Sequence, residues 1–375
     1  MFKTKGSELN RIFSVIYKKA IYFLLCFSSC FLFLCFNMFF NHSDNVAFAK
    51  DFSGLSSEIV MDVSSKRILF ENNAFEKKYM ASTTKILTAI CVIENCDINK
   101  VVTVTKDTVG IEGSSIYLEA GEKLTVKDLL YGLMLRSGND CAETLAKHVS
   151  GSIPKFAELM NTTAKNIGAF NSNFKNPHGL HNDEHYTTAY DLALISCYAI
   201  KNPIFKEIVS TKSIKIPHTT RDYDRLLINK NKMLQEFDGS TGIKTGFTKK
   251  AGRCLVTSCE RDGSEFVSVV LNCPPMFERS KELLTYSFDN YKTKTIINSE
   301  NIIDFLPVKN FDKKMAIGIK NDIKIPLKKD EENKIRIVYD YPEVLPETVK
   351  NGDEVGLIKI LCENNLLFTE KIYTI

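Results

Sequence analysis

The sequence has 375 residues, of which 44% are hydrophobic, and 49 Lys and Arg side chains stand against 45 Asp and Glu. This length allows two domains, and the ordinary apolar fraction without low-complexity tracts excludes a mainly disordered chain. The net charge of +4 gives no electrostatic support for nucleic-acid binding.

The first 49 residues have the pattern of an export signal. Five basic side chains lie in residues 1–19, residues 20–40 are apolar, and Ala47–Phe48–Ala49 is a small-x-small cleavage site. We expect cleavage after this site, with an uncleaved anchor as the alternative, because a 21-residue apolar stretch can span a bilayer. Either form places the remaining chain outside the cytoplasm, at the cell wall or the outer face of the cytoplasmic membrane.

Eight of the eleven cysteines follow this leader. They lie in apolar runs without paired spacings such as Cys-x-x-Cys, and the remaining chain is long enough to hold a core without disulfides. We therefore expect them to be small buried hydrophobic residues. They are Cys91, Cys96, Cys141, Cys197, Cys254, Cys259, Cys273 and Cys362.

The first expected elements are a hairpin and a helix. Glu58–Val63 and Arg67–Phe70 are short apolar segments on either side of a polar turn, which is typical of a β-hairpin. An apolar-periodic segment then predicts a helix that starts near Ser82 and ends near Asn95.

Three further helices are expected between residues 125 and 200. Thr125 and Asp128 form a capping box that predicts a helix ending at Arg136. A second helix starts at about Asp140, so the polar residues between the two can face a cleft. Thr188–Ile200 is expected to form the third.

The next region is expected to be an antiparallel sheet. Gly242–Gly246 is placed on a strand, with Cys254–Ser258 and Phe266–Leu271 as its neighbours. A helix across Glu278–Phe288 follows. From about residue 296, short alternating segments separated by turn residues predict a small all-β unit.

Two groups of residues attract a chemical interpretation. Ser82 and Lys85 are three residues apart, so at a helix start both side chains project from the same face. A lysine whose pKa is lowered by burial or by nearby cations can take the serine proton. His178, His181 and His185 match no regular face, so we interpret them as polar loop residues and expect no metal.

Three motifs follow one another in a characteristic order: Ser82-x-x-Lys85, Ser137-x-Asn139 and Lys244–Thr245–Gly246. With their flanks Leu129–Leu133 and Asn176–Leu180, they make the chain similar to the serine D-alanyl-D-alanine carboxypeptidases, the low-molecular-mass penicillin-binding proteins. The resemblance covers essentially the whole chain after the leader.

The resemblance implies an α/β fold: a DD-peptidase/β-lactamase-like domain, with an antiparallel sheet flanked by helices, and a small C-terminal all-β domain. The expected parts are the signal peptide or anchor at 1–49, the catalytic domain at 50–292 and the β-rich domain at 293–375. No cofactor is implied.

The resemblance also implies roles for the first two motifs. Ser82 is the nucleophile that attacks the carbonyl carbon of the penultimate D-alanine in a peptidoglycan stem peptide and forms an acyl-enzyme. Lys85 takes the serine proton, and Ser137 relays a proton to the leaving amine. Asn139 either orients the substrate backbone or fixes Lys85. β-Lactam antibiotics are the implied covalent inhibitors.

The third motif is implied to bind the substrate. Lys244 and Thr245 bind the terminal carboxylate, and Lys244 also helps to lower the pKa of Lys85. Gly246 lets a ligand backbone approach the strand. The backbone N–H of Phe247, with that of the nucleophile, forms the oxyanion hole.

The chain departs from the family in three places. Met80 replaces the proline that members often have before the nucleophile, and Glu265 stands at the position aligned with a carboxylate-binding arginine. The sequence stops without the amphipathic membrane helix of tethered members. Membrane contact is therefore expected only through residues 20–40, if they are not removed.

Three alternative functions are considered for a chain with these motifs. A serine β-lactamase needs a further base, and no Glu-x-x-Leu-Asn pattern occurs between Asn139 and Lys244. A non-catalytic penicillin-binding or peptidoglycan-binding module would not need all three motifs. An endopeptidase acting on cross-links would use the same residues. We expect carboxypeptidase activity, with slow release of bound penicillin.

Overall fold

The computed structural model describes residues 56–375. The signal peptide or anchor expected at residues 1–49 lies outside the described residues. Within residues 56–375, no helix combines the length and the apolar character needed to cross a membrane.

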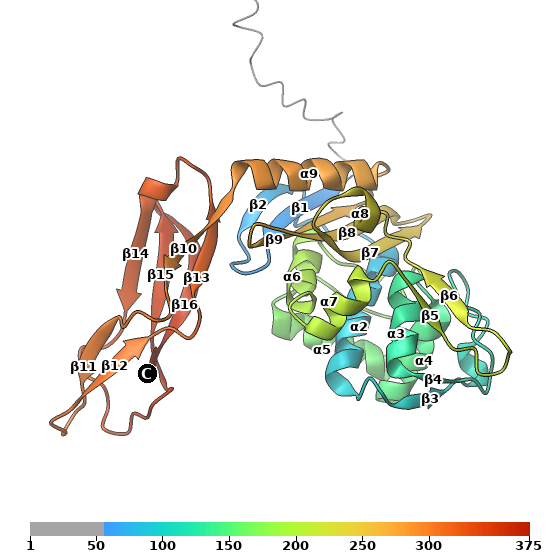
Figure 1. Ribbon diagram of the computed structural model, residues 1–375, viewed down its shortest axis with the longest axis horizontal. Coiled ribbons are helices and arrows are strands. Elements are labelled where there is room, and N and C mark those ends of the chain that lie inside the picture. Colours follow the sequence, from blue (N-terminus) through green and yellow to red (C-terminus); the bar gives the residue numbers. More distant parts are fainter. Residues whose placement is uncertain (1–55) are drawn as a thin grey trace, which may run out of the picture. The chain divides into compact units, whose positions relative to one another are not determined.

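A five-stranded antiparallel sheet, ordered β2-β1-β9-β8-β7, forms the centre of the first part of the fold (Figure 1). The strands are β1 (Ser57–Asp62), β2 (Ile68–Asn72), β7 (Ser240–Thr248), β8 (Gly252–Arg261) and β9 (Ser264–Leu271). The expected N-terminal hairpin is confirmed as β1 and β2. Among residues 56–375, only β8 pairs directly with β7, so the expectation that β9 also neighbours it is wrong, and β7 is at the edge of the described sheet.

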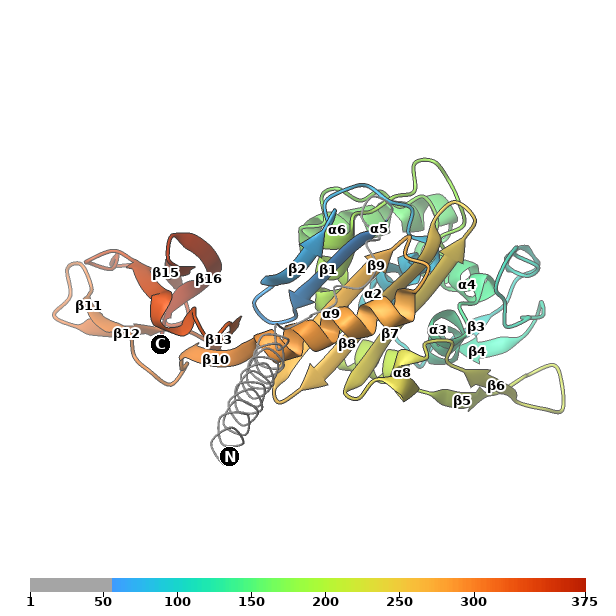
Figure 2. The same cartoon turned by 90° about the horizontal axis from the view of Figure 1, so that it is seen from above.

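Helices cover both faces of this sheet. Helix α9 contacts β8 and β9 on one face, and Figure 2 shows it running across these strands. Helices α2, α6 and α7 lie against the other face (Figure 1). The α-helices are α2 (Lys85–Asn95), α3 (Val126–Leu135), α4 (Asn139–Ser150), α5 (Ile153–Ile167), α6 (Ala189–Ala199), α7 (Pro203–Ser210), α8 (Met233–Glu236) and α9 (Met276–Asn290).

Short elements complete this part of the chain. Strands β3 and β4 form one two-stranded sheet, and β5 and β6 form another. Their bounds are β3 (Val101–Thr103), β4 (Lys123–Thr125), β5 (Ser213–Ile216) and β6 (Arg225–Ile228), with 3-10 helices at η1 (Ala81–Thr84) and η2 (Lys106–Thr108). The capping box predicted at the start of α3 is confirmed: the backbone N–H of Asp128 donates to Thr125 Oγ1 at 3.0 Å, and Thr125 N–H donates back to Asp128 Oδ2 at 3.1 Å.

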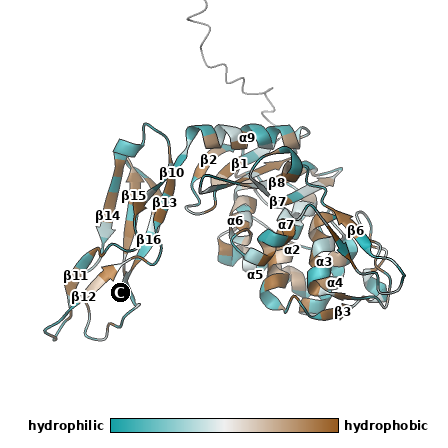
Figure 3. Cartoon of the chain, viewed as in Figure 1, coloured by the Kyte–Doolittle hydropathy of each residue, from teal (hydrophilic) through white to brown (hydrophobic). Residues whose placement is uncertain are grey.

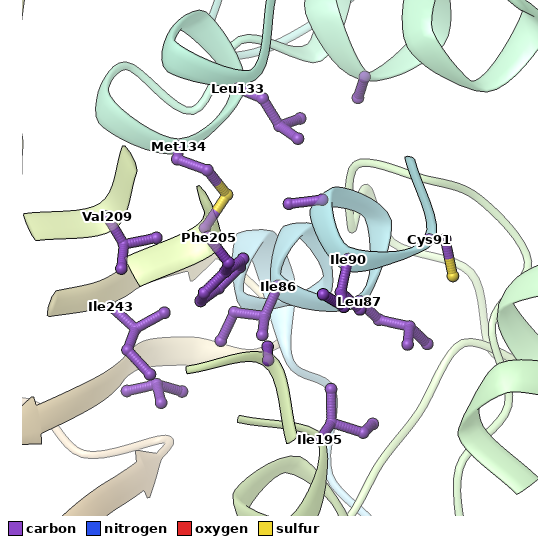
Figure 4. Close-up of a cluster of buried hydrophobic side chains, with 14 of the residues drawn as sticks. Ile86, Leu87, Ile90, Cys91, Leu133, Met134, Ile195, Phe205, Val209 and Ile243 are labelled. Carbon is purple, nitrogen blue, oxygen red and sulfur yellow. The ribbon is translucent and has the colours of Figure 1, made fainter. Parts of the chain in front are cut away.

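Helix α2 lies at the centre of the larger hydrophobic core. Ile86, Leu87 and Ile90 are at most 1% exposed. Figure 4 shows them among side chains of other elements, including Phe205 of α7 and Ile243 of β7. Burying each such side chain stabilises the fold by about 1.5–3 kcal/mol. The start of α2 is therefore held firmly against the sheet.

The eight described cysteines are all free thiols, and all but Cys96 are buried. This confirms the interpretation that they pack as small hydrophobic residues.

The last part of the chain is all β, as expected. A five-stranded sheet has the order β11-β12-β16-β15-β14, and β10 pairs with β13. The two sheets share a hydrophobic core, a separate cluster that includes Ile325, Ile358 and Ile372. Figure 3 shows hydrophobic residues on β12 and β15. The bounds are β10 (Lys292–Ile297), β11 (Asp304–Pro307), β12 (Lys314–Gly318), β13 (Ile323–Leu327), η3 (Glu332–Lys334), β14 (Ile335–Asp340), β15 (Glu354–Cys362) and β16 (Asn365–Thr374).

Candidate active site

The first motif lies where η1 passes into α2. Ser82 is in the 3-10 turn and Lys85 is the first residue of the α-helix, so both side chains project from one face. Lys85 Nζ lies 3.2 Å from Ser82 Oγ. The sequence-based expectation that these groups are neighbours is confirmed.

The side chain of Lys85 is fully buried, and its amine forms two hydrogen bonds in addition to its contact with Ser82. Nζ donates to Asn139 Oδ1 and to the backbone carbonyl of His178, both at 2.7 Å. Burial, and secondly the positive charge of Lys244, hold the pKa of Lys85 well below its usual value. The sequence analysis named both causes, and both are confirmed.

Asn139 stands at the start of α4 and is 3% exposed. Its Oδ1 accepts from Lys85, its Nδ2 donates to the Glu112 carbonyl, and its backbone N–H donates to the Ser114 carbonyl at 2.7 Å. These contacts tie the lysine to the loop before β4. Of its two expected roles, this geometry favours fixing Lys85.

Ser137 lies in the connection between α3 and α4, with its backbone in the left-handed region at φ 65°. Its Oγ is buried and makes no hydrogen bond to any described residue. Ala81, next to the nucleophile, also has a positive φ of 48°. Such non-glycine conformations cost about 1–3 kcal/mol each and collect at functional sites.

The third motif lies on the edge strand β7. Lys244 is 1% exposed, and its Nζ donates to the Thr245 carbonyl at 3.0 Å. Burial, with a smaller effect from the positive charge of Lys230, lowers the pKa of Lys244 to about 7. This lysine therefore changes charge in the physiological pH range.

Gly246 has a structural reason in addition to the one expected. A Cβ at this position would lie 3.1 Å from both the Met80 carbonyl oxygen and the Ser82 nitrogen. The glycine therefore permits β7 to pack tightly against η1, and its Cα faces the nucleophile turn. Gly246 also lines the pocket that contains Ser82, and the expectation that it lets a ligand backbone approach the strand stays a prediction.

These motifs meet at a pocket of about 340 Å³. Sequence analysis had singled out five of its lining residues and missed the other five. The lining consists of Ser82, Ser137, Thr245, Gly246 and Phe247, with Ser114, Lys230, Arg253, Met276 and Phe277. Lys230 Nζ donates to Ser114 Oγ at 3.1 Å, and the Arg253 guanidinium lies 5.6 Å from the centre of the Phe247 ring.

Glu265, which the sequence analysis aligned with a carboxylate-binding arginine, is held by other protein groups. Glu265 lies on β9 and accepts hydrogen bonds from Ser258 Oγ at 2.9 Å and Thr241 Oγ1 at 3.3 Å, and Lys206 Nζ lies 3.1 Å from it. It is not among the residues that line the pocket. The basic side chain that reaches the pocket from the strand after β7 is Arg253.

The histidines have structural partners. The His185 Nδ1 accepts from the backbone N–H of Lys175 at 3.0 Å, so its Nε2 carries the proton and donates to Thr84 Oγ1 at 2.8 Å. Burial lowers the pKa of His185 to about 3, so the ring is neutral. Within residues 56–375, no three His, Cys, Asp or Glu side chains are placed to hold a metal.

Buried charges brace the loop that borders the pocket. Asp140, next to Asn139, accepts from Ser115 Oγ at 2.5 Å and from the backbone N–H of Leu118 at 3.0 Å. Arg225 forms a bidentate pair with the buried Glu122 at 2.7 and 2.8 Å. Sequence analysis missed this ion pair, whose members lie about a hundred residues apart.

A buried lysine beside a serine at a helix start, facing an edge strand across a pocket lined by cations, defines an active-site-serine acyl-transfer enzyme. Residues 49–274 match the model of the family described as D-alanyl-D-alanine carboxypeptidase, and residues 291–375 match that of the penicillin-binding protein 5 C-terminal domain. The chain belongs to the D-alanyl-D-alanine carboxypeptidase family, whose members are serine hydrolases.

Individual proteins agree with this assignment over most of the chain. D-alanyl-D-alanine carboxypeptidase DacF of Bacillus subtilis is 29% identical over 86% of this chain and 87% of its own. DacC of Escherichia coli is 33% identical over 80% and 78%. The structure of penicillin binding protein 5 from Haemophilus influenzae, 26% identical, superposes with a TM-score of 0.72 over 85% of this chain and 96% of its own.

Proposed function

We propose that Ser82 is the nucleophile of this carboxypeptidase and Lys85 its base. The observation that carries the proposal is the 3.2 Å separation of Lys85 Nζ from Ser82 Oγ. A neutral amine has two N–H donors and one lone pair. Asn139 Oδ1 and the His178 carbonyl accept from both donors, so the lone pair remains for the serine proton.

In acylation, Ser82 Oγ attacks the carbonyl carbon of the penultimate D-alanine while its proton moves to Lys85. The C–N bond then breaks. The proton passes from Lys85 through the Ser137 hydroxyl to the leaving nitrogen, so the terminal D-alanine departs as an amine. The unpaired Oγ of Ser137 at the pocket wall supports this relay.

In deacylation, water attacks the ester on Ser82. Lys85, neutral again, takes a proton from the water and returns it to Ser82 Oγ as the C–O bond breaks. This assignment is supported by the composition of the pocket, because no Asp or Glu is among the described residues that line it. A carboxylate base of the β-lactamase type therefore has no counterpart in the described lining.

The terminal carboxylate of the substrate is proposed to bind at Thr245. Lys244 lies directly behind that residue, and Lys230 and Arg253 add positive charge along the pocket lining. The strongest interactions of a carboxylate are with such cationic donors. A substrate with a free C-terminal carboxylate is therefore favoured over one whose C-terminus is blocked.

The oxyanion hole is proposed to consist of the backbone N–H groups of Ser82 and Phe247. Support comes from the close packing at Gly246, where an added Cβ would lie only 3.1 Å from the Ser82 nitrogen. Strand β7 is at the edge of the described sheet, so no other described strand uses the N–H groups on its free side. The hole requires no particular side chain.

The proposed substrates are peptidoglycan stem peptides that end in D-Ala–D-Ala, and β-lactams are the proposed covalent inhibitors of Ser82. The names of the relatives and of the similar penicillin binding protein 5 structure support both. Because peptidoglycan lies outside the cytoplasmic membrane, we propose that the enzyme acts at the cell wall or at the outer face of the cytoplasmic membrane.

The direct test is to incubate the purified mature chain with a peptide ending in Lys–D-Ala–D-Ala and to assay free D-alanine, with Ser82→Ala as the control. We expect release by the wild type alone. Intact-mass analysis after penicillin treatment should show one slowly released adduct. Penicillin labelling without D-alanine release would instead favour a binding module, and many penicillin turnovers per second would favour a β-lactamase.

We also propose that residues 50–292 form the catalytic domain and residues 293–375 a β-rich domain that supports it at the cell wall. The hydrophobic clusters favour this division, because two draw their buried members from residues 59–291 and the third from residues 297–372. Truncation after about residue 295 should preserve D-alanine release from soluble peptides and lower activity on intact cell walls. Equal activity on cell walls would contradict the supporting role.

A further inference from the structure

A second hollow, of about 360 Å³, lies where the chain before η1 meets the turn between β7 and β8. It shares no lining residue with the pocket that contains Ser82. The charged and aromatic residues that line it are Lys77, Lys78, Tyr79, Asp183, Tyr186 and Lys250. We call it the lysine-lined hollow. No part of the proposed reaction uses it.

The lysine-lined hollow has an excess of positive charge. Its single carboxylate, Asp183, lies 3.1 Å from His181 Nε2. Lys78 pairs with Glu76 at 2.9 Å, a carboxylate whose side chain is 57% exposed. Lys250 makes no hydrogen bond or ion pair with a described residue, so its ammonium is available to a ligand.

Aromatic rings form the walls beside these cations. Lys77 Nζ lies 3.4 Å from the Tyr186 hydroxyl and 4.4 Å from the centre of its ring. The Tyr79 ring packs edge-on against the His181 ring, with 4.8 Å between centroids. The rings give the cations an organic surface, which suits an anionic group carried on a larger molecule.

Two chain segments lead from the active site to this hollow. On one side, the loop that begins with the His178 carbonyl, an acceptor for Lys85, leads to Asp183 and Tyr186. On the other side, Thr245 and Phe247 line the catalytic pocket, and the same strand leads into the turn that contains Lys250.

The direction of a bound substrate follows from the proposed function, on which this inference rests. A peptide that pairs antiparallel with the free edge of β7 has its C-terminal carboxylate at Thr245, and its N-terminal part extends past Thr248 toward the turn. Strand β7 ends at Thr248 and Lys250 lies in the turn that follows, so Lys250 is at most about 10 Å along the chain from Phe247. A group two or three residues before the cleaved bond therefore reaches this turn.

We propose that the lysine-lined hollow binds a carboxylate in the part of the substrate peptide that precedes D-Ala–D-Ala. The enzyme then recognises two anionic groups, one at each end of the bound segment. The terminal carboxylate positions the bond to be cleaved, and the upstream carboxylate selects peptides that carry a free acid at the correct distance.

The test uses two peptides that differ in one group. The acid peptide is N-acetyl-γ-D-glutamyl-Nε-acetyl-L-lysyl-D-alanyl-D-alanine, in which the glutamate α-carboxylate is free, and the amide peptide has that carboxylate as a primary amide. We expect the wild-type kcat/KM for D-alanine release to be roughly fivefold higher for the acid peptide, the effect of one ion pair near the surface. Added salt should reduce this preference.

Lys250→Glu should lower the ratio of acid-peptide to amide-peptide kcat/KM to about one or below. The matched control is Lys249→Glu, an exposed neighbour that does not line the hollow, and it should preserve the ratio. Equal wild-type activity on both peptides, or the same change in both variants, would overturn the proposal. Release of D-alanine from neither peptide would instead refute the proposed function, and this inference with it.

Discussion

The catalytic region and the C-terminal β region are built by different rules. Between residues 56 and 292, buried side chains include the amines of Lys85 and Lys244 and the carboxylate of Asp140. Among the described residues after 292, Thr374 is the only buried polar side chain. Because burying a charge is costly unless it is paired, the first region gives up stability to hold reactive groups.

Backbone conformation gives the same contrast in finer detail. Ala81 and Ser137 have positive φ values and lie beside or within the proposed machinery. In the C-terminal region the described non-glycine residues with positive φ, Asn310 and Glu363, lie in the connections between strands. Lys66 and Asp262, which lie in turns between strands, also have positive φ in the catalytic region, so what distinguishes this region is that Ala81 and Ser137 lie at the site.

The largest effect should come from removing the nucleophile. Ser82→Ala should abolish both D-alanine release and penicillin labelling, a loss of about a thousandfold or more, because it removes the hydroxyl that lies 3.2 Å from Lys85 Nζ. The measurement is D-alanine release together with intact mass. A variant with an unchanged circular dichroism spectrum and residual labelling would show that another group reacts.

A smaller loss is expected when the lysine is kept but its support is removed. Asn139→Ala should lower the acylation rate by about a hundredfold, the scale for a misplaced reactive group. Because Asn139 does not line the pocket, the loss should fall on kcat rather than KM. Asn95→Ala removes a similar amide that donates to the Cys91 carbonyl at the end of α2, and should acylate normally. A loss in KM alone would mean that Asn139 contacts substrate.

The pH profile tests the two buried lysines against each other. Lys85 must be neutral for acylation, whereas Lys244 holds a carboxylate best when charged. With the pKa of Lys244 lowered to about 7, kcat/KM should fall several-fold as the pH rises through this value. Since the positive charge of Lys230 contributes to that lowering, Lys230→Met should move the alkaline fall to higher pH. An unmoved profile would assign the titration to another group.

Local sequence signals were sufficient for much of the fold. The capping box at Thr125, the apolar stripe of α2 and the alternation in the strands each depend on neighbours a few residues away. Helix α5 has comparable signals that were not used: its N-cap Ser152 accepts a hydrogen bond from the backbone N–H of Lys155, and Gly168 ends it in the left-handed region. Its existence was therefore within reach of the sequence.

Other features depend on long-range pairing, which a sequence pattern does not contain. The placement of β1 beside β9, and so of β7 at the edge, joins residues about two hundred positions apart. Arg253, on β8, and Lys230, between β6 and α8, line the pocket through such long-range packing, and each resembles an ordinary surface cation in the sequence. The position of Glu265 outside the pocket lining has the same origin, since strand register decides which side chain reaches the pocket.

The smallest effect on chemistry should accompany a large effect on stability in the β region. Ile358 is fully buried in the C-terminal core, and Ile358→Ala should destabilise that region by about 2–5 kcal/mol through lost burial and a cavity. Ile302→Ala, at a side chain that is 48% exposed, should change stability by less than about 0.5 kcal/mol. Thermal denaturation measures both.

At temperatures where the variants are folded, kcat on a soluble peptide should stay within about twofold of wild type, because the proposed chemistry uses no group from this region. A parallel fall in kcat for Ile358→Ala would show that the β region holds the active site in shape, and the contrast between the two regions would then be one of composition and not of role.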